Sequence, residues 1–172
     1  MSSFSSQKIT LTALFLALGI IVPFLFHQFA LTGRIFLPMH IPVFLAGIFV
    51  GPLSGIIVGI LSPIISFFLT GMPPAYAVPL MAMELPIYGL CIGLLIRIKG
   101  LHLILALVIS MILGRFGFAT GLLILGQFLN MPYGFSTFLK VTFIAGLPGI
   151  IIQLILIPLL VKGISWATKP SS

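Results

Sequence analysis

Two oppositely charged residues, Glu84 and Arg115, stand inside long apolar stretches of the 172-residue chain, and Glu84 is its only acidic residue. A charge at the centre of a bilayer costs roughly 2.5–3.5 kcal/mol on insertion scales, so such residues are retained for a partner or a function. One interpretation is a buried ion pair that pins two helices together. The other, which we favour, is a water-filled cavity open to the outside, where both side chains recognise a small polar solute.

Four further residues complete the candidate binding set. Tyr88 follows Glu84 by four positions and so shares its helix face, where it offers a ring for stacking and a hydroxyl for hydrogen bonding. The other candidates are His40 and two residues in breaks between apolar stretches, Arg34 and Asn130. Loops rich in proline and polar residues, as these breaks are, can fold over a cavity and exclude water.

Common catalytic motifs are missing from the chain. It has no Asp, no G-x-x-x-x-G-K-[ST] phosphate loop and no H-E-x-x-H zinc motif. No G-x-S-x-G elbow surrounds Ser54, Ser62 or Ser66, so an intramembrane serine hydrolase is an alternative without a motif. We therefore expect no enzyme activity from this chain, and we predict neither a metal site nor a cofactor.

The elements that position these residues follow from composition. The chain is 60% hydrophobic and 5% charged, with a mean hydropathy of +1.38. A soluble domain carries about 25% charged residues, so this composition indicates an integral membrane protein. We predict an all-α fold, a single polytopic domain over residues 1–172, with six spans at residues 9–26, 38–50, 53–69, 77–96, 101–129 and 138–161. The second span is short, which tilting, a thinner bilayer or an irregular extension could accommodate.

The basic residues predict the orientation. With six spans, five Lys and Arg residues fall on the side of the termini and two on the other: Lys8, Arg97, Lys99, Lys162 and Lys169 against Arg34 and Lys140. This excess places both termini in the cytoplasm. The net charge of +7 is scattered over the chain, so membrane lipids are expected partners and nucleic acid is not.

Glycine recurs every fourth residue at Gly47, Gly51, Gly55 and Gly59. Small residues at this spacing let helices approach closely in membranes. Because Pro52 interrupts the pattern, we expect the seam to be divided between the second and third segments, where it serves helix packing.

Four stretches of the sequence together resemble one transporter family. They are ALFLA (13–17), GRIFLPMHIPVFLAGIFVGPLSGIIVGILSPIISFFLTGMPP (33–74), MAMELPIYGL (81–90) and GLPGIIIQLILIPLLVK (146–162). The chain resembles the substrate-binding S component of energy-coupling factor (ECF) vitamin transporters, over nearly its whole length.

The resemblance implies a subunit of the bacterial plasma membrane that binds a vitamin at its outer face. Such S components associate with a transmembrane coupling protein and two ABC-type ATPases, which supply the ATP hydrolysis that this chain lacks. The family's alanine motif in the first helix faces the coupling protein, and Ala13 and Ala17 match it.

The sequence leaves the substrate open. A carboxylate such as Glu84 suits hydrogen-bond donors, as on hydroxymethylpyrimidine or pyridoxine, whereas Arg115 suits a carboxylate, as on pantothenate. Two other classes of protein also stay open. One is a stand-alone secondary carrier or channel for a small polar solute, and the other is a structural subunit in which Glu84 and Arg115 are only a pair.

Overall fold

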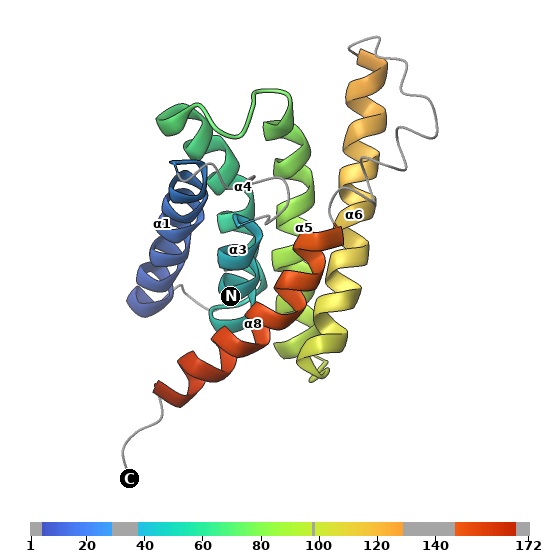
Figure 1. The fold of residues 1–172 in the computed structure, drawn as a ribbon. Helices are drawn as coiled ribbons and strands as arrows, with labels where there is room; N and C mark the ends of the chain where they lie inside the picture. Colours follow the sequence, from blue (N-terminus) through green and yellow to red (C-terminus); the bar gives the residue numbers. More distant parts are fainter. Residues whose placement is uncertain (1–4, 29–37, 98, 129–146, 168–172) are drawn as a thin grey trace.

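The computed structural model describes residues 5–28, 38–97, 99–128 and 147–167. In these ranges the chain forms six helices and no strand: α1 (Ser6–Gln28), α3 (His40–Phe49), α4 (Pro52–Thr70), α5 (Ala77–Arg97), α6 (Leu103–Phe128) and α8 (Leu147–Ala167) (Figure 1). The predicted all-α class is confirmed for these residues. Five of the helices are long and apolar enough to cross a membrane.

The exception is α3, which corresponds to the short segment predicted at residues 38–50. Its ten residues rise about 15 Å at 1.5 Å per residue, roughly half of a 30 Å hydrocarbon core. Of the last predicted span, 138–161, the structure describes only the part from Leu147, and α8 continues beyond it to Ala167. Six full spans therefore stay a prediction.

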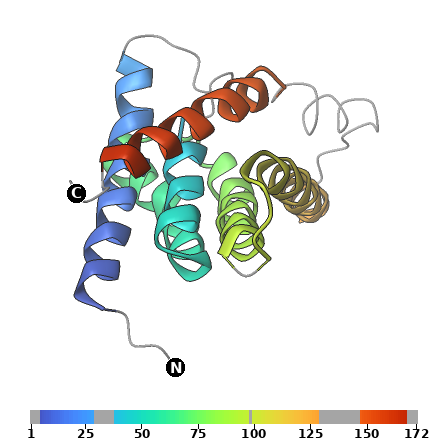
Figure 2. The same cartoon turned by 90° about the horizontal axis from the view of Figure 1, so that it is seen from below.

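The helices form a row with one helix laid across it. Seen along the bundle, the row begins with α1, continues with the pair α3 and α4 and then α5, and ends with α6 (Figure 2). α8 crosses this row obliquely (Figure 2). α5 is central, because it packs against α3, α4 and α6. The outer helices α1, α6 and α8 expose many large apolar side chains, as a lipid-facing surface requires.

Glycines allow α5 to meet its neighbours backbone to backbone. A Cβ added at Gly89 would lie 2.4 Å from the carbonyl carbon of Gly55, and one at Gly59 would lie 2.6 Å from the nitrogen of Pro86. A Cβ at Gly47 would come within 2.6 Å of the Gly89 carbonyl oxygen. The predicted division of the glycine seam between two helices is thus confirmed, and α5 supplies the opposing surface.

The turn between α3 and α4 explains why the seam is divided. Gly51 has φ 134°, which L side chains rarely adopt, and Pro52 then opens α4 at a position where a missing N–H costs nothing. The chain therefore reverses direction after the ten residues of α3.

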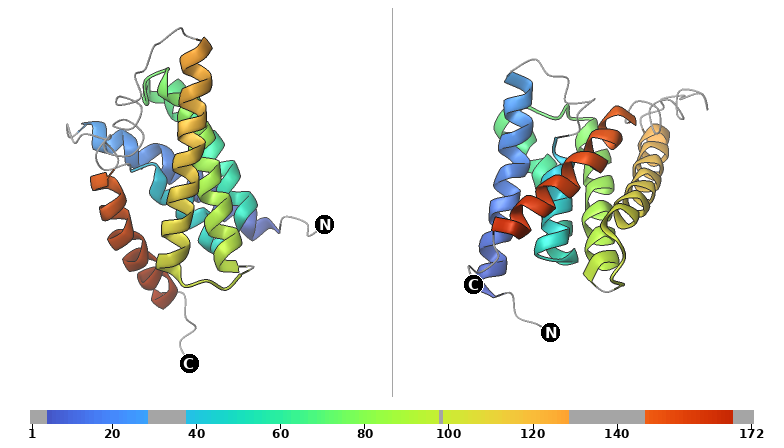
Figure 3. Two further views of the ribbon diagram at one scale, coloured as in Figure 1. Left: turned by 90° about the vertical axis from the view of Figure 1, so that its right-hand side faces the viewer. Right: turned by 60° about the horizontal axis from the view of Figure 1, so that its bottom comes forward.

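One end of the bundle can be defined from side-chain contacts. Arg97, the last residue of α5, donates to the carbonyls of Ile48 and Phe49 at the end of α3. Near the start of α1, Thr12 donates to Ser54 Oγ of α4 at 2.8 Å. The beginning of α1 and the end of α8 also lie toward this end (Figure 3). The membrane side on which this end lies stays a prediction.

Candidate functional site

Three helices each contribute a polar residue followed, one turn later, by an aromatic one. The pairs are His40 and Phe44 on α3, Glu84 and Tyr88 on α5, and Arg115 and Phe118 on α6. Residues three or four apart share a helix face, so each pair presents a polar group and a ring together. We call His40, Glu84, Tyr88 and Arg115 the Glu84 cluster.

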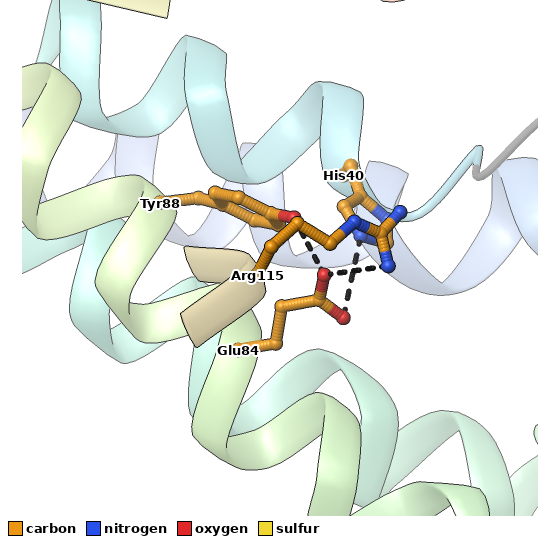
Figure 4. A network of polar contacts seen from close by, with 4 residues as sticks. All are labelled: His40, Glu84, Tyr88 and Arg115. Carbon is orange, nitrogen blue, oxygen red and sulfur yellow. Dashed lines mark hydrogen bonds and ion pairs between the residues drawn. The ribbon is translucent and has the colours of Figure 1, made fainter. Parts of the chain in front are cut away.

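The carboxylate of Glu84 is the centre of this cluster (Figure 4). Its Oε1 lies 3.1 Å from Arg115 Nη1 and accepts a hydrogen bond of 2.5 Å from the Tyr88 hydroxyl. Its Oε2 lies 3.9 Å from His40 Nε2, a distance that allows an ion pair with protonated imidazole but is too long for a hydrogen bond. The contact between Glu84 and Arg115, one of the two arrangements expected from the sequence, is therefore present.

All four side chains are buried. The exposed fraction is 2% for Glu84, 2% for His40, 1% for Tyr88 and 6% for Arg115. The sequence predicted Glu84 and Arg115 in the wall of a cavity open to the outside. The structure shows that the two side chains meet, but because both are buried, the opening of the cavity to the outside stays a prediction.

The cluster lies deep in the bundle. Glu84 is seven residues into α5, about 10 Å along the axis at 1.5 Å per residue. Arg115 is twelve residues into α6, about 18 Å from its start and a similar distance from its end. A carboxylate and a guanidinium at such depth are paired, which agrees with the rarity of unpaired charge in the hydrocarbon region.

Pairing with Glu84 does not use all the polar groups of the cluster. Among the described residues, Arg115 Nε and Nη2 have no hydrogen-bond partner, and neither has either ring nitrogen of His40. A buried polar group without a partner costs about 1–3 kcal/mol, and more when it is charged. The cluster thus presents more hydrogen-bonding capacity than the ion pair consumes.

Aromatic rings border the cluster on two sides. The Tyr88 ring centre lies 5.1 Å from that of Phe44 and 5.2 Å from that of His40. On the other side, the Arg115 guanidinium carbon lies 5.9 Å from the Phe118 ring centre, within the range of a cation–π contact. The site combines charge, hydrogen-bonding groups and flat apolar surfaces, as sites for small polar solutes do.

The sequence matches the family described as "ECF transporter, substrate-specific component" over residues 7–161. This is most of the chain. The protein belongs to the substrate-specific component family of ECF transporters. It is therefore a multi-pass membrane protein that binds a transported substrate and acts with other ECF subunits, and it is not itself an enzyme. No curated protein and no solved structure is significantly similar to the chain.

The S component brings together four of the six predicted binding residues, His40, Glu84, Tyr88 and Arg115. The other two, Arg34 and Asn130, lie outside the described residues. Within the described part of the chain, no group of three or more His, Cys, Asp or Glu side chains could hold a metal ion.

The predicted partner-interface alanines lie on α1. Ala13 is exposed and Ala17 is half-buried, whereas Thr12, Phe15 and Gly19 of the same helix are buried. The Ala13 position is thus accessible on the outside of the S component, as an interface residue must be.

Three residues around the site were missed by sequence reasoning. Phe44 could have been found, because it follows His40 by four positions. Phe118 likewise follows Arg115 by three. Gly114 makes room for the Tyr88 ring, because a Cβ there would lie 2.2 Å from Tyr88 Cε1. The sequence carried no signal for this role, since it depends on how α5 and α6 pack.

Proposed function

We propose that this S component binds a vitamin or a vitamin precursor at the Glu84 cluster and takes part in its uptake across the bacterial plasma membrane. The observation that carries the proposal is the excess of hydrogen-bonding groups on Arg115 and His40 beside an ion pair at mid-depth of the bundle. An ion pair with a purely structural role gains little over apolar packing, and leaving its donors unpartnered adds further cost. A polar solute would satisfy them.

In this proposal all four side chains of the Glu84 cluster contact the solute, and Arg34 and Asn130 stay candidates for further contacts from the outer side. Phe44 and Tyr88 contribute flat surfaces against which a ring or a short carbon chain could pack. The cytoplasmic location of both termini belongs to the same proposal, because it places the start of α3, with His40, toward the outer side of the membrane.

Energy for uptake would come from a coupling protein and two ABC-type ATPases. We expect vesicles that contain this S component alone to bind solute without accumulating it, and vesicles with the complete ECF assembly to accumulate it when ATP is inside. A non-hydrolysable ATP analogue is the control. Accumulation by the isolated protein under a proton or sodium gradient would instead establish a stand-alone carrier.

The α1 alanines provide a test of assembly. Replacing Ala13 with tryptophan places a bulky side chain on an exposed position of α1, where close approach of a partner helix needs a small residue. We expect co-purification with the coupling protein and the ATPases to fall by more than tenfold, while solute binding to the isolated S component is unchanged.

The matched control adds the same side chain elsewhere. Leu105→Trp lies on an exposed position of α6, and we expect it to leave assembly intact. Full co-purification and normal transport by the Ala13→Trp protein would show that Ala13 does not face the coupling protein.

A further inference from the structure

The unpartnered groups of the Glu84 cluster show a chemical bias. Arg115 Nε and Nη2 are donors only, and each ring nitrogen of His40 donates when it carries a proton and accepts when it does not. Glu84 Oε1, the principal acceptor, is already used by the Tyr88 hydroxyl and by Arg115 Nη1. A solute that enters here therefore meets more free donors than free acceptors.

We propose that the solute carries a carboxylate, held by the free edge of Arg115 and by His40, while Glu84 keeps Arg115 in position. This inference rests on the proposed function, because it concerns the solute that binds at the same cluster. It decides between the carboxylate and carboxylate-free solutes that the sequence left open.

The geometry of the guanidinium supports this assignment. Nε and Nη2 lie on one edge of the planar group, and their N–H bonds run parallel, which matches the two oxygens of a carboxylate. Glu84 occupies Nη1, on the opposite side of the group. Arg115 can therefore bind both carboxylates at once, one from the protein and one from the solute.

Charge gives a second argument. Glu84 and Arg115 cancel each other, so a solute carboxylate would leave a buried negative charge if no other group compensated it. His40 is placed for this compensation: its Nε2 lies 3.9 Å from Glu84 Oε2, and its two nitrogens have no hydrogen-bond partner among the described residues. A hydrogen bond from His40 to the solute carboxylate would offset part of this cost.

The second carboxylate oxygen of Glu84, Oε2, narrows the class of solute further. Glu84 Oε2 lies 3.9 Å from His40 Nε2, beyond hydrogen-bond distance, and it can accept from one donor of the solute. The Tyr88 ring, whose hydroxyl donates to Glu84 Oε1, packs against that of Phe44. A small monocarboxylate with a nearby hydroxyl or amide N–H fits this arrangement, whereas a ring with many hydrogen-bond donors would find few acceptors in the site.

The test compares matched probes on the purified full-length protein. Pantothenate and nicotinate carry a carboxylate, and pantothenol and nicotinamide are their carboxylate-free counterparts; hydroxymethylpyrimidine and pyridoxine complete the set. Any solute that co-purifies is identified by mass spectrometry and compared with its amide. We expect the bound solute to be a carboxylate that binds about 100-fold more tightly than its neutral counterpart, a factor on the scale of charge-assisted hydrogen bonds.

The variant Arg115→Lys isolates the role of the free edge. Lysine retains the charge that pairs with Glu84 but has no parallel N–H fork, so the melting temperature should stay near that of the wild type. We expect the preference for the acid over its neutral counterpart to fall at least tenfold. Lys162→Gln removes an exposed positive charge on α8, far from the cluster in sequence, and should leave that preference unchanged.

The possible failures are distinguishable. Equal binding of acid and neutral counterpart, or a bound solute without a carboxylate, would overturn this inference and leave the proposed function standing. A solute whose affinity is the same in wild type, Arg115→Lys and His40→Ala would show that binding occurs elsewhere, which overturns both. No bound solute at all would count against the proposed function itself.

Discussion

Replacing Arg115 with methionine is expected to destabilise the protein by about 3–5 kcal/mol, the cost of leaving one partner of a buried ion pair alone. The carboxylate of Glu84 would stay buried with only the Tyr88 hydroxyl at hydrogen-bond distance and His40 at 3.9 Å. Unfolding of the purified protein by SDS in mixed micelles, with the melting temperature as a second readout, measures the loss.

The double replacement Glu84→Gln with Arg115→Met separates stability from binding. It removes both charges, so most of the lost stability should return, because apolar substitutes for buried pairs are often tolerated. Solute binding by the double variant should nevertheless be impaired. Lys162→Met, an exposed position on α8, is the control and should change stability by no more than about 0.5 kcal/mol. A loss below 1 kcal/mol for Arg115→Met alone would contradict the buried pairing.

Replacing Gly89 with leucine is expected to prevent the correct packing of α4 against α5. Even the Cβ of alanine would lie 2.4 Å from the carbonyl carbon of Gly55, and backbone atoms cannot move aside as a flexible side chain can. We therefore expect Gly89→Ala to cost about 1–3 kcal/mol, the usual cost of overpacking, and Gly89→Leu to give little folded protein.

The matched control is a glycine of α8. A Cβ at Gly163 meets no heavy atom within 4 Å, so Gly163→Ala should raise stability slightly, by about 0.5–1 kcal/mol, because alanine favours helix. Equal melting temperatures for Gly89→Ala and Gly163→Ala would mean that α4 and α5 do not touch at this seam.

Much of the fold could be predicted because hydropathy reports directly on burial in lipid. Most described helix boundaries agree closely with the apolar segments: residues 53–69 were predicted, and α4 spans Pro52–Thr70. The exception is the end of α8, which was predicted at residue 161 and lies at Ala167. The glycine spacing likewise indicated close packing. Its partner could not be deduced, because the opposing Gly89 lies on a helix that is remote in sequence.

The site was predictable in its parts but not in its geometry. The i+4 spacing placed Tyr88 beside Glu84, and the hydrogen bond between them follows from it. The cost of intramembrane charge singled out Glu84 and Arg115. The place of His40 beside Glu84 could not be predicted, since it depends on how the short α3 packs against α5. The Phe44 and Phe118 rings went unnoticed because aromatic residues are common in membrane helices.

The most direct test of the Glu84 cluster as a binding site is the affinity of the Glu84→Gln protein for the solute that binds the wild type. Glutamine preserves the shape of the side chain, but it removes the charge and one of the two acceptor oxygens. Affinity and melting temperature are measured on the same preparation, so that a folding defect is not mistaken for a binding defect. We expect affinity to fall by roughly 10- to 150-fold, the equivalent of a charge-assisted hydrogen bond of about 1.5–3 kcal/mol. An unchanged affinity with a lowered melting temperature would contradict the account and leave Glu84 and Arg115 as a structural pair.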